Sequence, residues 1–190
     1  MKPFTLGILS GGRGTRVGGS DKGWLSWQGK PLIQYPLDTF SSLATEIIIS
    51  ANRELPRYLA LPARVVTDLR PDFCGPMAGL ESIMSATTTW PLMIIGCDMP
   101  NLPTTVAEQL ISSLSACQPI VVAHDGNRQQ HLCMAIADEH SISSLKRYLD
   151  DGGRSAYGWL TQNHAAQISF PQSKEAFENV NRLNEDSAAH

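Results

Sequence analysis

The chain has 190 residues, a length that fits one α/β domain at the usual size of roughly 100–200 residues per domain. Hydrophobic residues make up 42% of it, which is enough for a core, and the formal net charge of −3 argues against a nucleic-acid binder or a membrane-surface protein. No apolar run approaches the roughly 20 residues needed to span a bilayer, and the start Met-Lys-Pro-Phe leaves no room for a signal peptide.

The cysteine pattern indicates a reducing compartment. Four cysteines are present, at positions 74, 97, 117 and 133, and none forms a Cys-x-x-Cys pair. We therefore expect reduced thiols in a cytoplasmic protein rather than disulfides or a zinc site.

Apolar runs and stretches with helical spacing alternate along the chain. We expect strands over 4–10, 46–51, 64–67, 92–96, 119–123, 131–136 and 167–170, and helices over 31–43, 57–61, 75–86, 104–114, 142–149 and 155–160. Near-continuous apolar strands separated by helices predict a single-domain, Rossmann-like α/β fold. Its sheet would be mostly parallel, with helices on both faces.

Polar residues follow several of the predicted strands. Ser10-Gly11-Gly12, Ser50, Asp68 and Asp98 each come at or just after a strand end. Because open parallel sheets bind ligands at the carboxyl ends of their strands, we expect one site built from these segments.

Residues 6–23 form a strand followed by a glycine-rich loop. Glycines stand at 11, 12, 14, 18 and 19, interleaved with Arg13, Arg16 and Lys22. Close backbone N–H groups beside cations suit a polyphosphate. The loop is neither a P-loop, because Gly29-Lys30 is followed by Pro31, nor a dinucleotide fingerprint, because Gly18 comes one position late. The alternative is a surface glycine loop after an edge strand.

Further candidates come from the residues themselves. Asp98, after a strand without other charges, could ligate Mg²⁺, which takes one or two carboxylates with phosphate oxygens; capping the next helix is the alternative. Asp68 could accept from a base or ribose, or form a turn. Gly79 inside a helix requires either close approach to a ligand or tight packing on the sheet. Arg154 is a candidate for an anionic second substrate, and Arg128 and His131 could meet it too; a solvated surface role is open for each.

The motif Leu-Ser-Gly-Gly-x-x-x-Arg-x-Gly-x-x-Asp-Lys, with Cys97-Asp98-Met99-Pro100, resembles nucleotidyltransferases that activate sugars and cofactors with an NTP. It is most similar to the molybdenum cofactor guanylyltransferase family. Ser10 stands where that family typically has alanine and Val17 where it has methionine. Ser50 replaces a frequent asparagine, which puts that contact in doubt. Asn179-Val180-Asn181 resembles a late motif of the family, although Arg182-Leu183 follows it instead of Thr-Pro.

The resemblance implies a set of roles. Asp98 would bind the metal, Lys22 and Arg16 would act with it in catalysis, and Arg154, Asn179 and Asn181 would bind the acceptor. The nucleotide would contact Leu9, Ser10, Gly11, Gly12, Lys22, Ser50, Asp68, Gly75, Gly79 and Asp98.

The resemblance also implies an activity. The protein would transfer GMP from Mg²⁺-bound GTP to molybdopterin, form the guanine dinucleotide cofactor and release pyrophosphate. Residues 1–100 would bind the NTP and 101–184 the acceptor. The protein would be a monomer or weak oligomer, with molybdoenzymes or other biosynthetic proteins as further partners. A cytidylyltransferase, a sugar-phosphate enzyme and a non-catalytic carrier of the pterin cofactor are the alternatives.

Overall fold

The computed structural model describes residues 2–10, 21–71, 75–171 and 174–180. Seven strands form one sheet, in the order β5-β4-β1-β6-β8-β7-β9. The strands are β1 (Thr5–Leu9), β4 (Glu46–Ser50), β5 (Arg64–Val66), β6 (Leu92–Gly96), β7 (Ile120–His124), β8 (Gln129–Ile136) and β9 (Ala166–Ser169). Within this sheet β8 alone runs antiparallel to its neighbours. The predicted mostly parallel α/β fold is confirmed.

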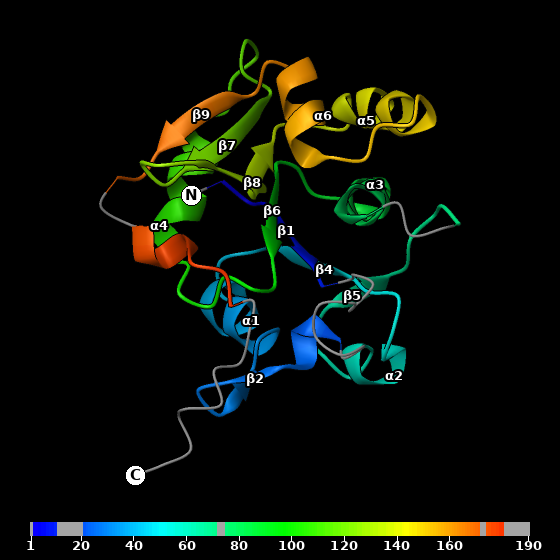
Figure 1. Ribbon diagram of the computed structural model, residues 1–190, viewed down its shortest axis with the longest axis vertical. Coiled ribbons are helices and arrows are strands. Elements are labelled where there is room, and N and C mark those ends of the chain that lie inside the picture. The colour runs from blue at the N-terminus through cyan, green and yellow to red at the C-terminus, as the bar shows by residue number, and fades with distance from the viewer. Residues whose placement is uncertain (1, 11–20, 72–74, 172–173, 181–190) are drawn as a thin grey trace.

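Helices cover both faces of the sheet (Figure 1). One face carries α1 (Gln34–Phe40) and α4 (Thr104–Ser112), and the other carries α3 (Pro76–Ala86), α5 (Ser141–Asp150) and α6 (Ala156–Gln162). Each face has its own apolar core, because alternate residues of a strand point to opposite sides. Among the described residues no helix is both long and apolar enough to cross a membrane.

The order in which the chain adds strands to the sheet changes side at β1. From β1 it passes to β4 and β5 on one side, and it then returns to β6 on the other side, where β6 pairs with β1 in parallel. In open α/β sheets, ligands bind at such a switch point, in the region outside the carboxyl ends of the strands that is called the crevice. Ser10 and Asp98 follow these two strands, so both lie at this crevice.

A hairpin that was not predicted ends at Pro31, the residue at which a helix was predicted to begin. Strands β2 (Ser26–Trp27) and β3 (Lys30–Pro31) pair in antiparallel fashion around Gln28 and Gly29. Both turn residues have positive φ, at 48° and 78°, as the two-residue turns that match strand twist require. Helix α1 therefore starts only at Gln34. The short helix expected over 57–61 likewise lies earlier, as α2 (Leu55–Tyr58).

Two short 3₁₀ helices, η1 (Lys22–Trp24) and η2 (Lys174–Phe177), were not predicted. Residue Asp21 caps η1, its side chain accepting a hydrogen bond from Gly23 N. This turn fixes the backbone on either side of Lys22.

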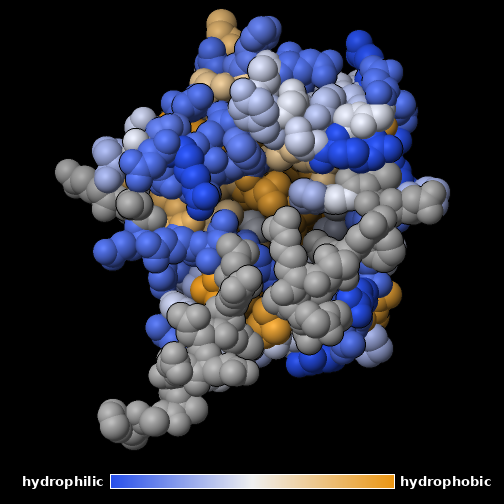
Figure 2. Space-filling view, viewed as in Figure 1, coloured by the Kyte–Doolittle hydropathy of each residue, from blue (hydrophilic) through white to orange (hydrophobic). Residues whose placement is uncertain are grey.

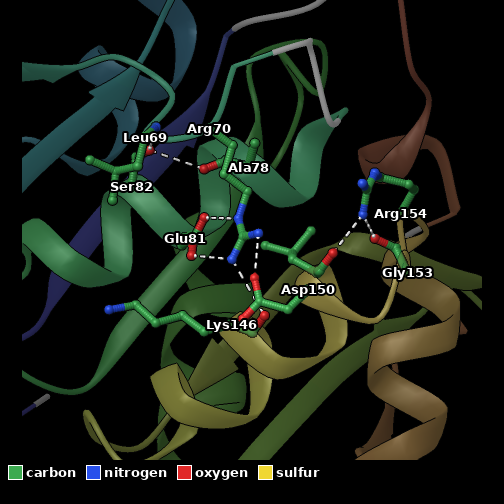
Figure 3. Close-up of polar contacts among 10 residues, drawn as sticks. Leu69, Arg70, Ala78, Glu81, Ser82, Lys146, Asp150, Gly153 and Arg154 are labelled. Atoms are coloured by element: carbon green, nitrogen blue, oxygen red, sulfur yellow. Dashed lines mark hydrogen bonds and ion pairs between the residues drawn. The ribbon is translucent and has the colours of Figure 1, made fainter.

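An ion-pair clamp centred on Arg70 ties the loop after β5 to two helices (Figure 3). Its guanidinium donates to both oxygens of Glu81, from Nε at 2.7 Å and Nη2 at 2.9 Å, and Nη1 donates to Asp150 Oδ1 at 2.7 Å. Glu81 is 3% exposed on α3, whereas Asp150 lies at the exposed end of α5. These carboxylates raise the pKa of Arg70, Glu81 most of all. The clamp joins elements from the two halves of the chain.

Arg70→Ala should lower the free energy of unfolding by about 3 kcal/mol, because it leaves the Glu81 carboxylate buried without its partner. Urea denaturation followed by circular dichroism measures this change. Lys30→Ala is the matched control: it breaks the exposed pair with Asp38 and should cost less than about 1 kcal/mol. If both variants lost the same free energy of unfolding, the buried carboxylate of Glu81 would not be the cause of the loss, and the prediction would be wrong.

Candidate functional site

A lysine and an aspartate face each other across the central crevice. Lys22 Nζ lies 2.5 Å from Asp98 Oδ2, and the side chains are 31% and 16% exposed, so a ligand can reach both. Gly96 permits this arrangement, because a Cβ there would lie 2.5 Å from Asp98 Oδ1. The crevice therefore presents an ammonium beside a carboxylate, groups that suit a phosphate chain and a divalent cation respectively.

A chain of hydrogen bonds anchors the segment before Lys22. Tyr58 Oη donates to Asp21 Oδ1 at 2.5 Å, and the Ser10 hydroxyl lies 2.6 Å from the same Tyr58 oxygen, to which it donates. Asp21 Oδ1 also accepts from Gly23 N at 3.0 Å. Burial raises the pKa of the Asp21 carboxyl, and the hydrogen bond from Tyr58 opposes part of the rise. The Ser10 side chain, 2% exposed, is thus committed to this network.

Cys97, the neighbour of Asp98, lies within the core at the same strand end. Burial, together with the negative charge of Asp98, raises the pKa of its thiol to about 12. The thiol is therefore neutral at pH 7 and unsuited to act as a nucleophile.

Asp68 lies at the outer end of the same sheet edge, after β5. Its N–H donates to Asn52 Oδ1 at 2.9 Å, and the next residue, Leu69, donates from its N–H to Ser82 Oγ at 3.0 Å (Figure 3). Burial raises the pKa of the Asp68 carboxyl, and a hydrogen bond with the Asn52 side chain lowers it in part. Side chains from the end of β4 and from α3 thus fix the loop that carries Asp68.

The start of helix α3 packs closely on the sheet. A Cβ on Gly79 would lie 2.6 Å from Ser50 Oγ and 3.0 Å from Leu9 Cδ2, so tight packing explains this glycine. Gly75 precedes the helix with φ of 72°, a conformation that favours glycine. Ser50 and Leu9 are buried at 1% and 7% exposure, and their roles as nucleotide contacts stay predictions.

The C-terminal segment returns to Asp98. Val180 N–H donates to the Asp98 carbonyl at 2.9 Å, which places the neighbouring Asn179 at the crevice. The buried Asn179 Oδ1 has no hydrogen-bond partner among the described residues. A buried oxygen left unpaired costs roughly 1–3 kcal/mol, so this atom is an acceptor suited to a ligand donor or a cation.

Arg154 lies against the end of α5. Its Nη1 donates to the carbonyls of Leu149 at 2.8 Å and Gly153 at 2.6 Å (Figure 3). The Arg154 carbonyl lies 3.9 Å from the position a Cβ on Gly75 would take, so this loop adjoins the start of α3. The exposed arginine thus adjoins Gly75, a predicted nucleotide contact, and acceptor binding by Arg154 remains a prediction.

The hairpin residues Arg128 and His131 are placed differently from each other. The Arg128 guanidinium is exposed and lies 3.8 Å from the buried Asp125 carboxylate. The His131 ring packs against Tyr157 at 5.4 Å between centroids, and burial lowers its pKa, as does the positive charge of Arg128.

Four predicted site residues, Gly11, Gly12, Arg16 and Asn181, lie outside the described residues. The structure brings Lys22, Asp98 and Asn179 together, and it places Asp68 on a separate loop of the same edge. Sequence reasoning missed Asp21 and Tyr58 as residues that shape the site, and it noted Asn52 near a strand end without giving it a role. The Asp-Lys pair was a signal for Asp21, whereas no local pattern marks Tyr58, 37 positions from its partner.

The face of the molecule seen in Figure 2 has both apolar and hydrophilic residues. Figure 2 shows apolar residues at the centre of this face, over the middle strands, with hydrophilic residues around them.

Comparison with known sequences identifies the family. A family model described as the MobA-like NTP transferase domain matches residues 6–166. A molybdenum cofactor guanylyltransferase from Serratia proteamaculans is 39% identical over 179 residues, covering 92% of this chain and 87% of that protein. Another from Cupriavidus metallidurans is 34% identical over 183 residues, covering 94% and 90%.

Solved structures share the fold. Molybdopterin-guanine dinucleotide biosynthesis protein A from Archaeoglobus fulgidus superposes with a TM-score of 0.74 at 20% identity, covering 93% of this chain and 92% of that one. The Rv0371C complex with manganese from Mycobacterium tuberculosis gives a TM-score of 0.67 at 15% identity, covering 89% of each chain. With its sequence matched over nearly its whole length, the chain belongs to the molybdenum cofactor guanylyltransferase family and carries a MobA-like NTP transferase domain.

Proposed function

We infer that this protein is a nucleotidyltransferase that transfers GMP from GTP to molybdopterin, forming the guanine dinucleotide cofactor and releasing pyrophosphate. The family carries the name of this activity. The supporting observation in the structure is the pair of Lys22 and Asp98, 2.5 Å apart where the two central strands end.

The reaction requires positioning and charge neutralisation more than proton transfer. The terminal phosphate of the acceptor is already anionic, so its oxygen can attack the α-phosphorus of GTP while the bond to the β-phosphate breaks. Pyrophosphate carries away the electron pair of that bond. Lys22 would neutralise charge that develops on the phosphate chain, and no strong general base is needed.

The residues at the crevice fit a hard divalent cation, which we propose is Mg²⁺. Asp98 would hold it, and the Asn179 side-chain oxygen, which has no hydrogen-bond partner among the described residues, would be a further hard donor from the segment that contacts the Asp98 backbone. Within the described ranges no three His, Cys, Asp or Glu side chains cluster as a metal site. This fits Mg²⁺, which is bound by one or two carboxylates and otherwise by substrate phosphates and water. When bound, it would supply positive charge at the phosphates.

The halves of the chain are proposed to divide the substrates. The NTP would bind to about residues 1–100, with Arg16 and the backbone of Gly11 and Gly12 around the phosphates. The acceptor would bind to about 101–184, through Arg154, Asn179 and Asn181. A cytoplasmic location, a monomeric or weakly associating state, and molybdoenzymes or other biosynthetic proteins as partners remain predictions.

Pyrophosphate release from GTP, molybdopterin and Mg²⁺ tests the function, with CTP and ATP in parallel. Release with GTP that chelation by EDTA abolishes is the expected result. Release with CTP alone would instead indicate a cytidylyltransferase, and nucleotide binding without any release would indicate a carrier.

The variants Lys22→Ala and Asp98→Ala should each reduce kcat by at least about 100-fold, because each removes one charge of the pair that we propose meets the reacting phosphates. Lys30→Ala and Asp38→Ala are matched controls, since Lys30 Nζ and Asp38 Oδ2 form a comparable pair at 2.6 Å outside the site. The controls should retain wild-type kcat. Activity near wild type in either site variant would remove that residue from the mechanism.

Asp68→Ala should lower the preference for GTP over CTP by about ten- to hundredfold, the range expected for one hydrogen bond to a charged group. A carboxylate can accept from both N–H donors on the Watson–Crick edge of guanine, whereas cytosine offers an amino group alone. The ratio of kcat/KM for the two nucleotides measures the change. An unchanged ratio would contradict base recognition by Asp68.

A further inference from the structure

The hydroxyl of Tyr58 stands at the junction between the sheet and the turn that carries Lys22. Tyr58 is fully buried at the end of α2, and its Oη lies 2.6 Å from Ser10 Oγ and 2.5 Å from Asp21 Oδ1. Ser10 follows β1 directly, so this hydroxyl connects the central strand of the sheet with the residue before Lys22.

The hydrogen bond between Tyr58 and Asp21 involves one sequence neighbour of Lys22 directly and the other, Gly23, through Asp21. Asp21 accepts the Tyr58 proton, and the same carboxylate oxygen accepts from Gly23 N. A Cβ on Gly23 would collide with Ser10 Oγ and Tyr58 Oη, so the turn can approach the hydroxyl only with glycine there. The backbone of Lys22 is thus held from both sides.

Aromatic contacts hold the next residue of the turn. The Trp24 ring packs on the Tyr58 ring at 5.0 Å between centroids, and the Arg57 guanidinium lies 4.0 Å from the Trp24 ring centroid. Tyr58 makes the contact with Trp24 through its aromatic ring, whereas it makes the contact with Asp21 through its hydroxyl. Removal of the hydroxyl therefore separates the positioning of Lys22 from the packing of the core.

We propose that Tyr58 is a positioning residue for the transfer reaction: its hydroxyl, held between Ser10 and Asp21, fixes the turn that aims the Lys22 amine at the crevice. The proposal rests on the proposed function in so far as Lys22 meets the phosphates. The Ser10 to Tyr58 bond holds the hydroxyl from the side of the sheet.

Kinetics of Tyr58→Phe provide the first test. We expect kcat to fall about ten- to hundredfold, because the lost hydrogen bond involves a carboxylate and small misplacements of a catalytic group are costly. The KM for GTP should change much less, since Tyr58 does not line the crevice. Tyr35→Phe is the control: it removes the hydroxyl that donates to the Trp27 carbonyl in the hairpin, and it should leave kcat unchanged.

A second variant pair covers the case in which Tyr58→Phe does not fold. Asp21→Asn keeps an oxygen that can accept from both Tyr58 and Gly23, whereas Asp21→Ala keeps none. We expect Asp21→Ala to lose clearly more kcat than Asp21→Asn. Equal losses would overturn the proposal.

A readout independent of turnover is the labelling of lysines by reductive methylation, followed by peptide mass spectrometry. In Tyr58→Phe, labelling of Lys22 relative to the exposed Lys146 should rise several-fold, and in Tyr35→Phe it should not. An unchanged ratio, or an unchanged kcat in a folded Tyr58→Phe protein, would overturn the proposal. If the wild type releases no pyrophosphate, the proposed function fails, and the labelling ratio alone decides the role of Tyr58.

Discussion

The parallel pairing of β1 with β6 is the constraint on which the site depends. Its register sets Leu9 opposite Gly96, so the segments that follow these two residues leave the sheet side by side. Lys22 and Asp98, which are 76 positions apart in the sequence, thereby form an ion pair. A shift of the register by one residue would turn every side chain of a strand to the opposite face, and it would separate the lysine from the aspartate.

The rest of the structure limits how these charges can move. Glycine at position 96 leaves room for the aspartate, and glycine at position 79 lets α3 lie directly on the strand ends. The C-terminal segment adds a backbone hydrogen bond to the Asp98 carbonyl. The acid is thus held by its strand and by a segment from the far end of the chain, which is the preorganisation that stabilisation of developing charge requires.

The sequence predicted those parts of the molecule that depend on local pattern. Apolar runs located the strands, and the rule that ligands bind at carboxyl ends selected Asp98, which follows β6. Lys22 was selected by the glycine-rich loop and its resemblance to the nucleotidyltransferase motif. The hairpin of β2 and β3 was missed, since Gln-Gly is a weaker turn signal than Asn-Gly and the apolar residues after it suit a helix. Tyr58 and Asn52 could not be predicted, because their partners lie 37 and 16 positions away and depend on how the sheet packs.

The ion-pair clamp at Arg70 connects the first hundred residues of the chain to the residues that follow them. Arg70 belongs to the half proposed to bind the nucleotide, yet it bonds to Asp150 at the end of α5, in the half proposed to bind the acceptor. Strand β6 also pairs with β8 across the same division. Fragments cut near residue 100 would therefore each lose a strand partner, and the ion pair between Arg70 and Asp150 would be broken. The proposed division between the two substrates therefore does not coincide with a boundary between domains, because one continuous sheet contains strands of both halves.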